Sequence, residues 1–78
     1  MQADSLIILE SAFRHGVLEE DMLHAVRNRV AILPQDDGCD LFIGPARSGH
    51  PMLEIGVIVW FGVIAINHAM PARKKYWR

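Results

Sequence analysis

The longest apolar run of the chain, residues 55–67, limits what the sequence can fold into. The run is shorter than the ~20 apolar residues that a membrane-spanning helix needs, and Gly56 and Gly62 interrupt it. Its near-continuous apolar character is typical of central strands that are covered by helices. We therefore expect two strands, at residues 52–59 and 63–67, joined tightly near Gly62.

Two further strands are expected upstream, where the pattern is that of a hairpin. Residues 30–33 are apolar and end at a proline, and residues 39–43 form the next apolar segment. Between them, an Asp-Gly pair at 37–38 favours the positive φ of a tight turn. A loop at residues 44–51 then leads to the apolar run, so the sequence predicts an antiparallel meander of about four strands.

The first part of the chain has helical spacing. Asp4 or Ser5 can cap a helix by accepting a hydrogen bond from a free N–H, and Gly16 can end it. Between these limits, residues at spacings of three and four share one helical face: Leu6, Leu9 and Phe13. Residues 6–9 are also compatible with a short strand.

A second helix is expected at residues 19–28. Three acidic residues stand near its start and Arg27 stands near its end, which suits the helix dipole. The buried stripe of this helix is expected to hold Leu18, Met22, Ala25 and Val26. The predicted fold class is therefore α+β, with two N-terminal helices packed on an antiparallel sheet of about four strands.

Length and composition narrow the class of protein. A chain of 78 residues makes a single domain, 1–78, and 51% hydrophobic with 22% charged residues is a globular balance. Cys39 is the one cysteine, which excludes an internal disulfide and a cysteine-rich zinc site. The histidines are too dispersed for a local metal motif, and no phosphate-binding glycine loop occurs, so we expect no metal and no cofactor. No basic segment precedes a hydrophobic start, which favours a cytoplasmic protein that does not contact a membrane.

Charge is distributed unevenly along the chain. Residues 1–46 hold three basic and eight acidic side chains, whereas residues 47–78 hold five basic and one acidic. The basic excess gathers in the C-terminal segment 71–78, which suits an anionic partner such as nucleic acid. A solvated tail without a partner is the alternative.

The densest set of chemically competent side chains lies at this end of the chain. His68, Arg73, Lys75 and Tyr76 are of the types that metal-independent RNA cleavage needs. Arginine and lysine neutralise a phosphate and its transition state, and histidine or tyrosine can move the protons. Tyr76 and Trp77 also offer rings on which an unpaired base can stack. The alternative for His68 is an ordinary strand residue.

Trp60 and Phe61 stand where the last hairpin turns, a place usually taken by polar residues and glycine. A hydrophobic tip that cannot reach its own core indicates a contact with another chain. The alternative is that the strands run differently and bury both rings.

Three segments resemble small bacterial toxins related to the BrnT group of the RelE/ParE superfamily. They are Arg14-His15-Gly16-Val17, then Leu41-Phe42-Ile43-Gly44 followed by Arg47 and Leu53-Glu54, and the ending His68-Ala69-Met70-Pro71-Ala72-Arg73-Lys74-Lys75-Tyr76. The resemblance covers residues 13–77, and the ending is its most specific part.

The resemblance implies a RelE-like fold and the toxin half of a type II toxin–antitoxin pair, a ribonuclease that a neighbouring antitoxin protein neutralises. Arg73 would bind the scissile phosphate with help from Lys75, and His68 or Tyr76 would handle protons. RNA, free or on the ribosome, would be held by Arg47, Lys74 and Arg78. On this hypothesis a neutral substitution of Arg73 abolishes growth arrest without lowering the melting temperature. The alternative is a non-catalytic binding module, either an inactive relative or a homodimeric partner protein.

Overall fold

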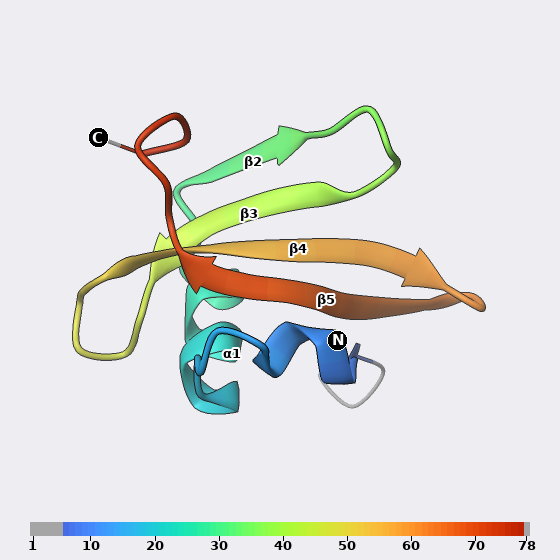
Figure 1. Ribbon diagram of the computed structural model, residues 1–78, viewed down its shortest axis with the longest axis horizontal. Helices are drawn as coiled ribbons and strands as arrows, with labels where there is room; N and C mark the ends of the chain where they lie inside the picture. Colours follow the sequence, from blue (N-terminus) through green and yellow to red (C-terminus); the bar gives the residue numbers. More distant parts are fainter. Residues whose placement is uncertain (1–5, 78) are drawn as a thin grey trace.

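The computed structural model describes residues 6–77 as one sheet with an α-helix against one face (Figure 1). In chain order the elements are β1 (Leu6–Ile8), the 3-10 helix η2 (Glu10–Phe13), α1 (Glu19–Arg27), β2 (Ala31–Pro34), β3 (Asp40–Pro45), β4 (Met52–Trp60) and β5 (Val63–Pro71). The order across the sheet is β1-β5-β4-β3-β2. Strands β2 to β5 form an antiparallel meander, and β1 pairs parallel to β5 at the edge.

The expected architecture, two N-terminal helices on a four-stranded antiparallel sheet, is wrong. The described part of the chain has one α-helix, and its sheet has five strands of mixed direction. A strand and a single 3-10 turn replace the first expected helix, because Ile7 and Ile8 are β-branched and the backbone of β1 finds partners along β5. The short strand that residues 6–9 also allow is therefore the one that forms. The expected cap at Asp4 or Ser5 lies outside the described residues.

The second expected helix is present as α1, one residue shorter at its end, and it packs against β3 and β4. Its buried side chains join a core built with β4 and β5, which includes Met22, Ala25, Ile55, Ile66 and Ala69. Leu18, expected in the buried stripe, is 55% exposed and precedes the helix without a side-chain cap. No helix among residues 6–77 is long and apolar enough to cross a membrane.

Gly44 of β3 permits close packing between the helix and the sheet. A Cβ at this position would collide with the backbone carbonyl of Ala25 in α1, so a side chain here would push the helix away. Gly44 pairs with Leu53 of β4, so the contact lies one residue from the end of the β3–β4 pairing.

A β-bulge interrupts the pairing of β4 with β5. Gly56 lies opposite His68 and Val57 lies opposite Ile66, which leaves Asn67 as an extra residue on β5. Successive side chains of a regular strand point to opposite faces, but here a Cβ on Gly56 would meet both the Asn67 amide oxygen and the His68 Cβ. The bulge therefore gathers two polar side chains on one face of the sheet.

The chain that follows β5 crosses the face of the sheet opposite α1. Leu53 and Ile55 of β4 point into the core with α1, so Glu54 between them points to the other face. The Ala72 N–H donates to the Met52 carbonyl (2.9 Å), and the chain then runs across the sheet toward β2 (Figure 1). The two polar residues of the bulge and the C-terminal segment thereby meet on one face.

Candidate functional site

An open pocket of about 270 Å³ lies on this face of the sheet. Its walls come from the β2–β3 turn, β3, the bulge of β5 and the C-terminal segment, and the residues are Gln35, Asp37, Cys39, Leu41, Asn67, His68, Arg73 and Tyr76. Three of the four residues predicted to be catalytic, His68, Arg73 and Tyr76, therefore line one pocket.

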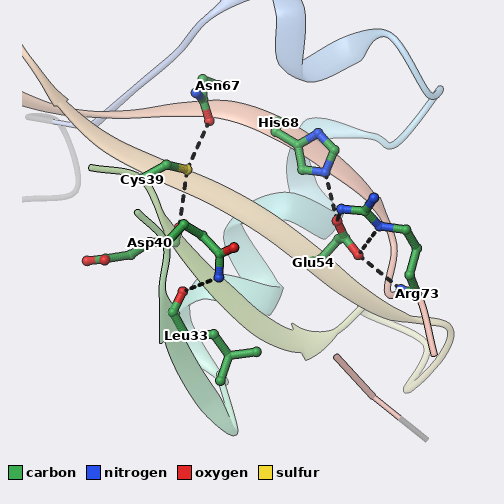
Figure 2. A network of polar contacts seen from close by, with 8 residues as sticks. Leu33, Cys39, Asp40, Glu54, Asn67, His68 and Arg73 are labelled. Carbon is green, nitrogen blue, oxygen red and sulfur yellow. Dashed lines mark hydrogen bonds and ion pairs between the residues drawn. The ribbon is translucent and has the colours of Figure 1, made fainter. Parts of the chain in front are cut away.

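A buried glutamate holds two of these three residues in place (Figure 2). The Glu54 side chain has no solvent exposure, and its carboxylate accepts four hydrogen bonds. Oε1 accepts from the backbone N–H (3.0 Å) and the Nε–H (3.1 Å) of Arg73. Oε2 accepts from Nη2 of Arg73 (2.7 Å) and Nε2 of His68 (3.0 Å). A two-point arginine–carboxylate pair of this kind fixes orientation as well as charge.

These bonds fix the protonation of the glutamate and the tautomer of the histidine. Burial raises the pKa of Glu54, but the hydrogen bonds from Arg73 and His68 outweigh burial and hold that pKa below its ordinary value of 4.5. An ionised carboxylate can only accept, so Nε2 of His68 carries the hydrogen. In the neutral ring the lone pair then lies on Nδ1, which points away from Glu54 (Figure 2) and is able to accept a proton.

Two cations contact the ring of Tyr76. The guanidinium carbon of Arg73 lies 5.2 Å from the ring centroid and Nζ of Lys75 lies 5.0 Å from it, both within the range of cation–π interactions. The hydrogen bonds to Glu54 raise the pKa of Arg73, so its charge is permanent. Those bonds use Nε and Nη2 of a side chain that is 47% exposed, which leaves Nη1 to bind a ligand.

The other end of the pocket holds a thiol and an amide. Sγ of Cys39 lies 3.8 Å from Oδ1 of Asn67 and 3.7 Å from the Asp40 carbonyl (Figure 2). Burial and the nearby Asp37 carboxylate raise the pKa of the Cys39 thiol. The raised pKa favours the protonated thiol over the thiolate, which is the reactive form of cysteine. The S–H donates a hydrogen bond to Oδ1 of Asn67.

Two of the residues predicted to bind RNA, Arg47 and Lys74, do not line the pocket. Arg47 donates to the Asp21 carboxylate of α1 from its backbone N–H (3.0 Å) and its Nε–H (3.1 Å), and these bonds lower the pKa of Asp21. Lys74 is exposed between two pocket-associated residues of the C-terminal segment. Arg78 lies outside the described residues. The structure thus brings Arg73 to the pocket and Lys75 to the Tyr76 ring, and it places Arg47 beside α1.

Trp60 and Phe61 lie at the turn between β4 and β5, at the end of the hairpin away from the bulge. Their rings contact each other edge to face at 4.8 Å, and the residues are 43% and 88% exposed. The alternative in which both rings are buried is therefore wrong, and the contact with another chain stays a prediction.

Two residues that contact His68 were not predicted from the sequence. Glu54 is the one aspartate, glutamate, lysine or arginine between residues 52 and 72. A charge inside an apolar strand needs a partner, so the sequence did indicate that Glu54 is paired. His15 lies edge-on to His68, with ring centroids 5.8 Å apart. Its position follows from the turn after η2, which the sequence pattern does not predict.

Among residues 6–77, no group of three or more histidine, cysteine, aspartate or glutamate side chains is placed to hold a metal ion. Comparison of the chain with protein-family models, curated proteins and solved structures gave no match. The function is therefore proposed from the chemistry of the pocket. The pocket combines a histidine and an arginine that Glu54 holds in place with a phenol whose ring Lys75 contacts.

Proposed function

We propose that this chain is the toxin of a type II toxin–antitoxin pair and that it cleaves RNA by a metal-independent reaction in the pocket of His68, Arg73 and Tyr76. One observation carries the proposal: the buried Glu54 carboxylate orients a histidine and an arginine toward the same open pocket. A carboxylate that fixes the tautomer and direction of a histidine is a recurrent way to prepare a general base.

The reaction that fits these groups is attack of a ribose 2′-hydroxyl on the adjacent phosphorus. Nδ1 of His68 takes the hydroxyl proton as the new O–P bond forms. Arg73 and Lys75 neutralise the negative charge that gathers on the phosphoryl oxygens. The bond from phosphorus to the 5′-oxygen breaks, and that oxygen takes a proton from the Tyr76 hydroxyl. The products are a 2′,3′-cyclic phosphate and a 5′-hydroxyl, and water returns the proton from the histidine to the tyrosine.

The substrate in this proposal is single-stranded RNA. Trp77, which follows the pocket residues, is 43% exposed and offers a ring on which an unpaired base can stack. Lys74 is exposed in the same C-terminal segment and can meet the RNA backbone. The antitoxin would be a protein that covers this pocket, and an acidic surface would suit the cations of the C-terminal segment.

Inducible expression of the chain in bacteria, with mapping of new 5′ ends on cellular RNA, tests the proposal. Growth arrest accompanied by new RNA ends is expected. The purified chain should also cut single-stranded RNA in the presence of EDTA and leave 5′-hydroxyl ends. Intact RNA in both experiments, with soluble and folded protein, overturns the proposal.

Two variants assign the roles and one serves as the control. His68→Gln should lower the cleavage rate about 10²–10⁴-fold, because general-base catalysis contributes that much. Tyr76→Phe removes only the hydroxyl and should slow cleavage while RNA binding is unchanged. Arg27→Gln, which changes an exposed cation of α1 on the other face of the sheet, should keep most of the activity. Cleavage rates of His68→Gln and Tyr76→Phe equal to that of wild type would remove His68 and Tyr76 from the mechanism.

A non-catalytic nucleic-acid-binding module is the second candidate. The observation that favours it is the ion pair of Arg73 with Glu54, which offsets the positive charge that Arg73 brings to the pocket. Such a module would bind single-stranded RNA in a salt-dependent manner and leave its ends unchanged. Binding by wild type and His68→Gln alike, without cleavage by either, would favour this candidate.

A further inference from the structure

The end of the β4–β5 hairpin is an exposed apolar surface. Four of its residues are exposed by 43–88%, and we name them the hairpin surface: Val59, Trp60, Phe61 and Ile64. No charged residue occurs between positions 55 and 67. β3 pairs with β4 only as far as Val57, so within the described chain residues 58–60 extend past β3 with one edge unpaired (Figure 1). Proteins usually protect such an edge with a charge or a proline, and residues 58–64 at the end of this hairpin include neither.

The backbone conformation of Phe61, at the tip of the hairpin, is unfavourable for an aromatic residue. Phe61 has a φ of +51°, a left-handed conformation that glycine and asparagine adopt far more readily than a bulky residue does. Its side chain is nevertheless 88% exposed and contacts Trp60, which is itself 43% exposed, so burial in the core of this chain does not compensate for the strain. Strained residues of this kind concentrate where function requires them.

An apolar groove lies beside this surface, on the face of the sheet that carries α1. It has a volume of about 250 Å³, and Arg27 together with six apolar residues lines it: Leu6, Leu23, Val26, Phe42, Val57 and Ile64. Ile64 belongs to both the groove and the hairpin surface, and it pairs with Val59 across the hairpin. Val59 and Ile64 therefore join the groove and the exposed hairpin end into one apolar region, with Trp60, the next residue of β4, on the other face of the sheet.

We infer that this region binds a second copy of the chain, in a two-fold dimer in which the hairpin end of each copy lies in the groove of the other. One molecule carries both a projecting apolar end and an apolar groove next to it, which is the self-complementarity that a two-fold interface needs. The hairpin surface carries no charge, so it does not select a charged partner and does not repel a second copy of itself.

The available area is sufficient for a stable contact. A whole aromatic side chain buries ~150–250 Å², so the exposed fractions of the hairpin surface amount to roughly 400–500 Å² in each copy. Two copies together with the groove walls reach the roughly 1,000 Å² that a specific interface requires. The pocket of His68 and Arg73 lies on the opposite face of the sheet, so the dimer leaves it open.

The oligomeric state of the full chain tests the inference. Light scattering coupled to size exclusion, from about 1 to about 100 µM as suits an interface of this size, should show a mass near twice the chain's 8.8 kDa. Phe61→Asn keeps a residue that tolerates positive φ, so the variant should fold and its dimer should dissociate at least 10-fold more readily. Val59→Ser removes a second exposed side chain and should weaken the dimer in the same direction.

A matched control separates the interface from general hydrophobicity. Val30→Asn also removes an exposed apolar side chain, 58% exposed at the start of the β2–β3 hairpin, and should leave the dimer unchanged. Circular dichroism checks that every variant is folded. A wild-type chain that stays at 8.8 kDa throughout overturns the inference and leaves the hairpin surface to a different protein. Equal dissociation constants for wild type, Phe61→Asn and Val59→Ser also overturn it.

Discussion

Replacing Arg73 with alanine should destabilise the protein strongly, whatever it does to activity. The change removes two of the four hydrogen bonds that the buried Glu54 carboxylate accepts and leaves those from the Arg73 backbone and His68. Removing one partner of a buried ion pair costs about 3–5 kcal/mol. Because Arg73 is half exposed and water can approach the site, the expected loss is smaller, about 2–3 kcal/mol.

That loss is large for a chain of this size. A domain of 78 residues has a free energy of unfolding of about 4–12 kcal/mol, and the expected loss corresponds to a fall in melting temperature of about 10–20 °C. Thermal unfolding followed by circular dichroism at neutral pH measures it, with Lys74→Ala as the exposed control. A melting temperature for Arg73→Ala within about 2 °C of wild type would refute the structural role of the pair.

The pH dependence gives an independent check. The folded pKa of Glu54 lies below its ordinary value of 4.5, so the stabilisation is fully present above that value and is lost as the pH falls through the folded pKa. The difference in stability between wild type and Arg73→Ala should therefore narrow below about pH 4.5. In the double variant Glu54→Leu/Arg73→Met, both charges are absent, and the loss should be smaller than the sum of the two single changes. A difference that stays constant down to pH 3, or strictly additive losses, would contradict coupling between the two residues.

Three further predictions concern other parts of the fold. Leu18→Ser supplies the missing cap of α1 and should raise the free energy of unfolding by about 1 kcal/mol, seen as a rise in melting temperature of about 4–8 °C; a fall would contradict the cap argument. Gly44→Ala places a Cβ against the Ala25 carbonyl and should cost about 3 kcal/mol in urea unfolding, whereas a neutral outcome would mean that α1 is free to move. Cys39, whose pKa burial and Asp37 raise, should react with iodoacetamide more slowly in the folded chain than in urea; equal rates would count against that environment.

The sequence pattern predicts most of the secondary structure and less of its arrangement. The helix at residues 19–28 and the four strands of the meander follow from spacing and turn residues, and each is present within a few positions. β1 is different, because three residues form a strand only when an edge is available, and the partner strand β5 lies more than fifty residues away. Local spacing carries no information about that partner.

The candidate site was predictable in part. His68, Arg73 and Tyr76 are close in sequence, so their common pocket follows from a short segment of chain. The structural role of Arg73 was not predictable, because its partner Glu54 lies nineteen residues earlier on another strand. The sequence alone favoured an arginine whose loss leaves the melting temperature unchanged, and the ion pair reverses that expectation. The one sequence feature that indicated this pairing was Glu54, a single acidic residue within an apolar strand.

Asn67 is an extra residue in β5, because the pairing of β5 with β4 skips it. Ile66 and Ala69 both face the core although they are three positions apart, and a straight strand without residue 67 would keep both there with His68 on the outer face. A single-residue insertion within a strand normally turns every later side chain to the wrong face. Here the bulge absorbs the added residue, so the length of β5 can change by one at this position while Glu54 keeps both of its partners.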